Sequence, residues 1–131
     1  MQYTPSMSKR ARVVELWSVL KSPGRQGVIG LVQRLCDNAR RFATKLQAAG
    51  FNVVNDVVLN QVLVCCEDDA TTQQTIQHIQ AAGECWCGRS SWDGKVVIRI
   101  SVCDWATSES EINRSVSAFV AARELARREV V

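Results

Sequence analysis

Apolar side chains recur at every third or fourth position in four stretches of the chain, which is the spacing of amphipathic helices. The longest stripe lies within residues 25–49, where the apolar positions step alternately by four and three, and Gly50 is placed to end that helix. Pro23 and Gly24 separate it from an earlier helix. The four helices are expected over residues 8–20, 25–49, 70–82 and 108–129.

Between the helices the pattern changes to that of strands, with β-branched residues, an unbroken apolar run or strict alternation. The even-numbered positions of residues 95–103 are all apolar, so one face of that strand is expected in the core. Asp93 and Gly94, just before it, are typical of a tight hairpin turn. The four strands are expected over residues 51–54, 60–66, 84–89 and 95–103.

The predicted order is therefore helix, helix, strand, strand, helix, strand, strand, helix. Strands joined by hairpins and one crossover helix, with long helices at both ends, indicate an α+β fold in which helices pack on an antiparallel or mixed sheet. Two helix starts have the spacing of a capping box, Thr71 with Gln74 and Ser108 with Glu111.

The chain has 131 residues, 47% of them apolar and 22% charged, which is the size and composition of one globular domain. No apolar run approaches the roughly 18–20 residues of a membrane-spanning helix. The basic residues near the start are not followed by the apolar segment of a secretory signal. We therefore expect a cytoplasmic protein that needs no membrane.

The six cysteines fit that compartment, where thiols stay reduced. They are Cys36, Cys65, Cys66, Cys85, Cys87 and Cys103. Structural zinc sites space paired ligands by two to four residues, and neither the single residue between Cys85 and Cys87 nor the adjacent pair Cys65 and Cys66 matches that spacing. The pattern favours free, mostly buried thiols over a metal site.

The sequence offers little for catalysis by this chain alone. His78 is the only histidine and lies within a predicted amphipathic helix, where a surface or interface role is typical. Two S-x-x-K matches lack the motifs that accompany them in serine enzymes. Neither a P-loop nor a dinucleotide fingerprint occurs. No catalytic residue is assigned.

Basic residues concentrate in the first part of the chain, with nine basic and two acidic side chains in residues 1–50. Five of them lie along the longest predicted helix: Arg25, Arg34, Arg40, Arg41 and Lys45. This face could neutralise phosphates, but no platform of interleaved aromatic side chains accompanies its charges. A solvated helix face is the simpler interpretation, and nucleic acid is not an expected partner.

Arg99 stands in the middle of the clearest strand, between Ile98 and Ile100. Two interpretations fit the pattern equally. The guanidinium can form an ion pair with an acidic neighbour such as Asp56 or Glu84. It can instead form an anion site, because its planar fork matches a carboxylate in bidentate geometry.

Several segments together resemble one enzyme family. They are residues 50–62, residues 85–88 followed by Trp92, residues 97–102 followed by residues 105–107, and, near the start, residues 3–5, 8–12 and 16–20. Their order and spacing are similar to those of the group II pyridoxal-phosphate (PLP)-dependent decarboxylases, which include aromatic amino acid and glutamate decarboxylases. The resemblance covers nearly the whole chain.

The resemblance implies the C-terminal small domain of a fold-type I PLP enzyme, a homodimeric lyase of carboxylic acid metabolism with a chain several times longer. Residues 1–23 would be the helix and connection that leave the large domain, and residues 24–131 the small domain. In the family the cofactor lysine follows a histidine in the large domain. None of the four lysines here does so: Lys9, Lys21, Lys45 and Lys95.

The chain is therefore expected to be a fragment, a truncated gene product or a separately expressed domain. It should be inactive alone and bind no PLP, with the large domain or a companion polypeptide as its partner and a tendency to self-associate. Arg99 matches the family's small-domain strand arginine, which faces the active-site cleft and can bind the substrate carboxylate of an amino acid. The alternative function, from a different class, is a free-standing binding or regulatory module that uses the basic helix face to bind nucleic acid or protein.

Overall fold

The computed structural model describes residues 12–129 of the chain. The chain divides into two compact units, residues 1–32 and residues 33–131. The elements in chain order are α1 (Arg12–Lys21), α2 (Gly24–Ala48), β1 (Asn52–Val53), β2 (Gln61–Cys65), α3 (Asp69–Ala82), β3 (Gly88–Trp92), β4 (Lys95–Ser101) and α4 (Glu109–Glu129). The order of helices and strands is the one that the sequence predicts. The start of the first predicted helix, residues 8–11, lies outside the described residues.

In the first unit, α1 ends at Lys21, and Ser22 donates its backbone N–H to the carbonyl of Ser18. The apolar side chains of α1 are largely exposed: Val13, Val14, Leu16, Trp17, Val19 and Leu20. An apolar helix surface of this kind is typical of a segment that contacts another part of a protein.

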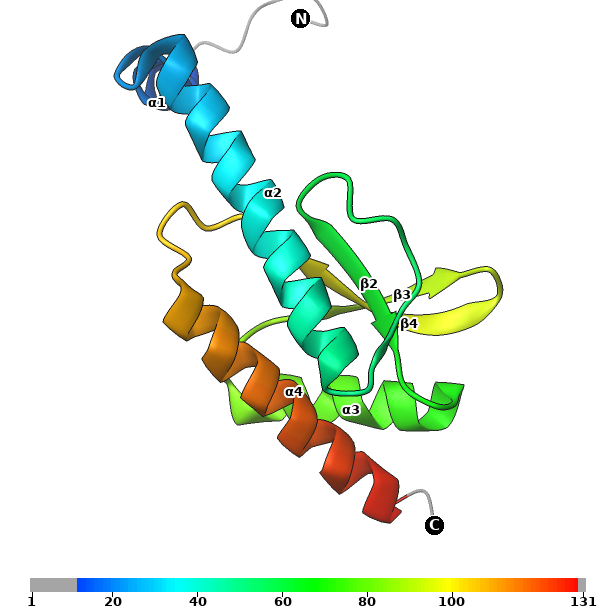
Figure 1. Ribbon diagram of the computed structural model, residues 1–131. Helices are drawn as coiled ribbons and strands as arrows, with labels where there is room; N and C mark the ends of the chain where they lie inside the picture. The colour runs from blue at the N-terminus through cyan, green and yellow to red at the C-terminus, as the bar shows by residue number, and fades with distance from the viewer. Residues whose placement is uncertain (1–11, 130–131) are drawn as a thin grey trace, which may run out of the picture. The chain divides into compact units, whose positions relative to one another are not determined.

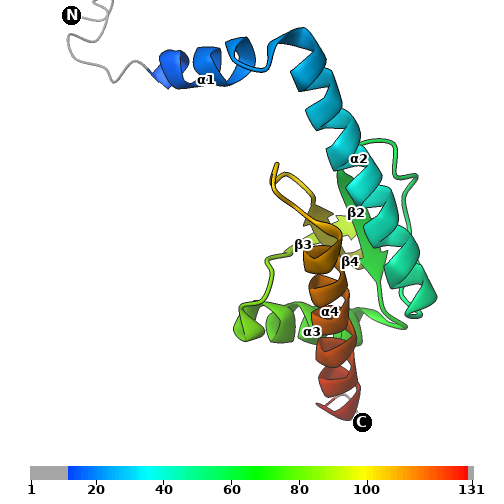
Figure 2. The ribbon, with the colours of Figure 1, turned by 60° about the vertical axis from the view of Figure 1, so that its left-hand side comes forward.

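In the second unit, the four strands form one antiparallel sheet in the order β1-β2-β4-β3. The helical layer lies on one face of the sheet, as Figures 1 and 2 show for α3 and α4. The core is built from that face and from the helices that cover it. Its most buried large side chains are Leu46, Val62, Val64, Ile79, Ile98, Ile112 and Phe119. The α+β fold class expected from the sequence is confirmed.

The opposite face of the sheet, which we call the open face, carries a second and much smaller apolar cluster. Leu63, Cys65 and Val97 are buried there, with Val54 packed against them. Strict alternation in β4 predicts a polar open face, and Val97 departs from it. Its cross-strand partner is Ser90, and the neighbouring strand supplies Leu63 and Cys65, so apolar side chains of β2 and β4 bury one another without a helix.

The hairpin between β3 and β4 explains why the third strand is shifted from its predicted place. Asp93 and Gly94 both have positive φ, 48° and 76°, which is the conformation of a two-residue type I′ turn. Trp92 and Lys95 pair across this turn, so β3 runs back from Trp92 to Gly88 and not from residue 89 to residue 84.

The two predicted helix caps have different outcomes. At α4 the capping box forms, because Glu111 accepts the backbone N–H of Ser108 at 2.7 Å and Ser108 Oγ accepts the backbone N–H of Glu111 at 3.4 Å. At α3 the prediction of Thr71 with Gln74 is wrong. Asp68 is the N-cap residue and accepts both the backbone N–H and the hydroxyl of Thr71, at 2.7 and 2.9 Å.

The cysteines are free thiols, and four of the six are buried, as the sequence predicts. Burial raises the pKa of the Cys66 thiol, and it raises the pKa of the Cys87 thiol to about 12. Within residues 12–129, no group of three or more histidine, cysteine or acidic side chains is placed to hold a metal ion. No helix in that range is long and apolar enough to cross a membrane.

Candidate functional site

Arg99 lies in the middle of β4, and its side chain is exposed on the open face of the sheet. β4 is an inner strand, so the residue has a partner on each side: Leu63 of β2 and Gly88 of β3. The buried positions Ile98 and Ile100 on either side of it anchor the strand in the core. The sheet thereby holds the base of the arginine side chain in a fixed place.

Gly88 leaves room beside the guanidinium. A Cβ at this position would lie 3.7 Å from Nη2 and 3.9 Å from Nε of Arg99. The glycine therefore lets the planar group lie close to the backbone of the edge strand, where a larger side chain would take the same space. Gly88 is not among the residues predicted for the site.

The guanidinium borders a shallow depression of about 620 Å³. Two segments supply its other polar side chains. They are Asn55, Asp56 and Gln61 from the β1–β2 region, and Ser90, Ser91 and Trp92 from β3. Trp92 is 46% exposed, so the depression combines a cation, hydrogen-bonding groups and one aromatic surface.

Asn55 fixes the segment that forms one side of this depression. Its side-chain oxygen accepts the backbone N–H of Leu63 at 2.8 Å, and its amide nitrogen donates to the carbonyls of Asp56 and Gln61, both at 3.2 Å. An asparagine between two strands is a usable sequence signal for such a tether, because its side chain readily bonds to nearby backbone. Asn55, like Gly88, is not among the residues predicted for the site.

Neither acidic residue considered as a partner of Arg99 forms an ion pair with it. Glu84 pairs with Arg114, whose Nη2 lies 2.6 Å from Oε1 of the carboxylate. Asp56 borders the same depression as Arg99, and within residues 12–129 the guanidinium has no hydrogen bond or ion pair. An exposed arginine fork with unused donors is suited to a carboxylate ligand.

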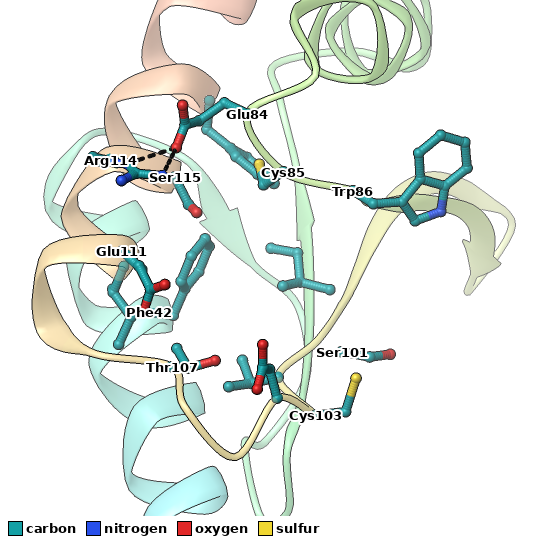
Figure 3. Close-up of a pocket in the computed structure, with 15 residues that line it drawn as sticks. Phe42, Glu84, Cys85, Trp86, Ser101, Cys103, Thr107, Glu111, Arg114 and Ser115 are labelled. Atoms are coloured by element: carbon teal, nitrogen blue, oxygen red, sulfur yellow. Dashed lines mark hydrogen bonds and ion pairs between the residues drawn. The ribbon is translucent and has the colours of Figure 1, made fainter.

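A second pocket, of about 440 Å³, lies on the helical side of the sheet; we call it the α4 pocket (Figure 3). Its floor consists of the buried side chains Phe42, Ile100, Val102, Ile112 and Phe119. Its rim comes from residues 84–86, from residues 101–107 and from the first half of α4. Arg99 does not line it.

The lysine that PLP requires is absent from both sites. Neither the depression beside Arg99 nor the α4 pocket is lined by a lysine. Lys45 donates to Asn113 Oδ1 at 2.7 Å and lies 3.6 Å from Glu109 Oε1, so it is engaged on the helix surface. Covalent PLP chemistry needs a lysine held in a shaped pocket. Among residues 12–129, neither site therefore offers a lysine that could hold PLP covalently.

His78 and the basic helix face lie away from both sites, whereas Cys85 and Cys103 line the α4 pocket. His78 contacts Glu129 through Nε2 and Oε2 at 3.1 Å, which joins the surfaces of α3 and α4. Two members of the basic helix face have acidic partners within the chain, since Arg40 forms an ion pair with Asp37 and Lys45 with Glu109. These contacts reduce the free positive charge on that face.

No family model matches the sequence. The fold is similar to part of several solved enzyme structures. Tryptophan decarboxylase from Catharanthus roseus superposes with a TM-score of 0.79 and 15% identity over 88% of this chain and 26% of that chain. The glutamate decarboxylase domain of a diaminobutyrate-pyruvate transaminase and L-2,4-diaminobutyrate decarboxylase from Vibrio parahaemolyticus gives 0.79 and 13%, over 92% of this chain and 27% of that chain. Serine palmitoyltransferase from Sphingomonas wittichii superposes with a TM-score of 0.62 and 19% identity, over 71% of this chain and 24% of that chain.

These similarities show the fold. This chain has the architecture of a segment found within PLP decarboxylases, and it spans about a quarter of the length of the enzymes that it matches. One matched structure, of Oryza sativa TDC, contains PLP and tryptamine. Because serine palmitoyltransferase also shares the fold, the fold alone does not select a reaction.

Proposed function

We propose that this chain is the C-terminal small domain of a PLP-dependent amino acid decarboxylase, inactive alone, which helps to close the active site and binds the substrate carboxylate. The observation that carries the proposal is the guanidinium of Arg99 on the open sheet face, which has no hydrogen bond or ion pair with residues 12–129. The proposal is supported by the similarity in fold to the decarboxylases. The superpositions cover about nine tenths of this chain and about a quarter of each decarboxylase chain.

Decarboxylases are favoured over the other enzymes with this fold for two reasons. The superposition on the decarboxylases has the higher TM-score and covers more of this chain than the superposition on serine palmitoyltransferase. The segments at residues 50–62, 85–88 and 97–102, with their spacing, resemble the group II decarboxylases. The reaction class rests on that resemblance.

Arg99 has a binding role in this proposal. Its two outer guanidinium nitrogens would donate paired, charge-assisted hydrogen bonds to the two oxygens of the substrate carboxylate. Gly88 keeps the space beside the fork open, and the buried flanks of β4 hold its base in place. No side chain of this chain is given a proton-transfer role.

The complete enzyme would supply what this chain lacks. When bound there, PLP provides the electron sink for cleavage of the carbon–carbon bond. The large domain, or a companion polypeptide, would carry the cofactor lysine. Residues 1–23 would connect to it and residues 24–131 form the small domain. The exposed apolar side chains of α1 suit contact with such a partner or with a second subunit of a cytoplasmic homodimer.

A chimera tests the proposal directly. The matching C-terminal segment of a full-length PLP decarboxylase is replaced by residues 24–131 of this chain, with the intact host and a host lacking the segment as controls. We expect the chimera to bind PLP and to decarboxylate the host's substrate well above the truncated control. A chimera that folds and binds PLP but is no more active than the truncated host would contradict the proposal.

A further inference from the structure

The α4 pocket lies in the second unit and is a separate feature from the depression beside Arg99. No residue lines both. Its volume of about 440 Å³ lies within the range of small-molecule sites, roughly 300–1,000 Å³. Its floor is apolar, and the rings of Phe42 and Phe119 meet there edge to face with their centroids 5.7 Å apart. Such a floor suits a compact apolar group of about one ring.

Hydrogen bonds hold two sides of this pocket in place. On one side, Asn38 of α2 donates to the carbonyl of Thr107 at 2.9 Å, which ties the connection before α4 to the helical layer. On the other side, Nε of Arg114 donates to Glu84 at 2.7 Å, which ties α4 to the segment before β3; Figure 3 shows this pair at the rim. The pocket is therefore largely formed before any ligand arrives.

The rim is acidic. Three carboxylates line the pocket, those of Glu84, Asp104 and Glu111, against the single guanidinium of Arg114. Glu84 is occupied by that guanidinium. Asp104 uses Oδ1 to accept the backbone N–H of Ala106, and Glu111 uses Oε2 in the capping box, so Oδ2 and Oε1 remain without a partner among residues 12–129.

We propose that the α4 pocket binds a small organic cation, a primary ammonium on a compact apolar body. The apolar body would lie on the floor of the two phenylalanine rings. The ammonium would donate to the free carboxylate oxygens of Asp104 and Glu111. A glutamate carboxylate is charged at neutral pH, and hydrogen bonds from the backbone and hydroxyl of Ser108 lower the pKa of Glu111 further.

The test uses the intact chain and three probes with the same ring: benzylamine, benzyl alcohol and benzoate. Binding is measured by calorimetry and by the rate at which iodoacetamide alkylates Cys103, read by mass spectrometry. Cys103 is exposed and lines the pocket, so an occupant should slow its alkylation. We expect benzylamine to bind most tightly, benzyl alcohol more weakly and benzoate least.

Two variants remove charge and keep the local hydrogen bonds. In Glu111→Gln the amide oxygen can still complete the capping box, and in Asp104→Asn it can still accept the N–H of Ala106. Each variant should weaken the binding of benzylamine by about two- to fivefold and leave the binding of benzyl alcohol unchanged. Asp93→Asn, in the hairpin turn away from the pocket, is the matched control and should change nothing.

The proposal is overturned if benzylamine and benzoate bind alike, if neither slows alkylation of Cys103, or if the control variant weakens benzylamine as much as the two rim variants. Because the test does not use Arg99 or PLP, its failure would leave the decarboxylase proposal standing.

Discussion

The guanidinium of Arg99 lies against Gly88, its cross-strand neighbour on β3, at the one position of that strand with no side chain. A Cβ on Gly88 would come within 3.7 Å of Nη2, which is an ordinary contact distance. A methyl group therefore fits at position 88, whereas a longer side chain would occupy the surface on which the guanidinium lies.

This relationship predicts a graded response at position 88. Gly88→Ala should leave the Nε–Hε resonance of Arg99 close to its original position, while Gly88→Leu should shift it and increase the mobility of the side chain. Both changes are measured by ¹⁵N NMR on the isolated chain, with Gly94→Ala, in the hairpin turn, as a control for altered stability. Identical Arg99 spectra in both position-88 variants would show that Gly88 does not position the guanidinium.

Arg123 is a buried cation on α4, 5% exposed, that joins three parts of the second unit. Its Nη2 donates to the carbonyl of Ala49 at 2.6 Å, and its guanidinium carbon lies 4.2 Å from the centre of the Phe51 ring. Its Nε and Nη1 are buried without a hydrogen-bond partner. Arg123 thus stabilises the unit through its hydrogen bond and its contact with the Phe51 ring, while two of its nitrogens are buried without a hydrogen-bond acceptor.

Arg123→Ala should therefore lower the free energy of unfolding by about 2–3 kcal/mol, because both the charged hydrogen bond and the packed stem are lost. Arg123→Met should cost less, because it keeps the stem and removes the two buried unsatisfied groups. Urea unfolding followed by circular dichroism measures both, with the exposed Arg128→Ala as the control. A methionine variant less stable than the alanine variant would contradict this explanation.

The buried thiol of Cys87 predicts a loss of stability at alkaline pH. Burial raises its pKa from 9.0 to about 12, so the folded state keeps its proton where the unfolded state has lost it. This contribution is fully present below pH 9 and is lost between pH 9 and about 12. The slope for one thiol is at most about 1.4 kcal/mol per pH unit.

In Cys87→Ala, the free energy of unfolding should fall less steeply with pH above pH 9 than it does in the original chain. The smaller side chain can also lower the free energy of unfolding by a constant amount, which does not change this slope. Cys103→Ala is the matched control, because that thiol is exposed and should leave the slope unchanged. Parallel curves for the original chain and Cys87→Ala would contradict the burial argument.

Much of the architecture is predictable from local pattern. The alternation of β4, the stripe of α2, and the turn at Asp93 and Gly94 are local signals, and the structure follows them. Once that turn is known, counting back from the pair Trp92 and Lys95 brings Gly88 opposite Arg99, so the neighbour of the candidate site was available from the sequence.

Other features depend on contacts between distant segments and leave no local signal. Arg123 reads as an ordinary basic residue near the end of an amphipathic helix, and its burial follows from how α4 packs on Ala49 and Phe51. The partner of Glu84 is a second example. The carboxylate pairs with Arg114 and not with Arg99, and no local pattern indicates this pair because 30 positions separate the two residues. The cap of α3 was ambiguous locally, since Asp68 and Thr71 both offer a capping oxygen.

The isolated chain should form no selective covalent adduct with PLP. Neither described pocket is lined by a lysine, and no lysine in the sequence follows a histidine. The chain is incubated with PLP, reduced with borohydride and mapped by mass spectrometry, with a full-length decarboxylase as the positive control. We expect low, distributed labelling of the lysines. One stoichiometric adduct accompanied by decarboxylation would show that the chain is an enzyme by itself.

The most direct measurement of the central claim, that Arg99 binds the substrate carboxylate, uses the chimera that carries residues 24–131. Arg99→Ala should lower kcat/KM roughly ten- to a hundredfold, the usual effect of losing a charge-assisted pair. Arg99→Lys should be nearly as harmful, because an ammonium keeps the charge without the fork. Arg128→Ala is the matched control, and melting temperatures are measured alongside. If Arg99 binds the substrate carboxylate, both variants lose activity at an unchanged melting temperature. Retained activity with a lowered melting temperature would contradict it, and would assign Arg99 a structural role in the sheet.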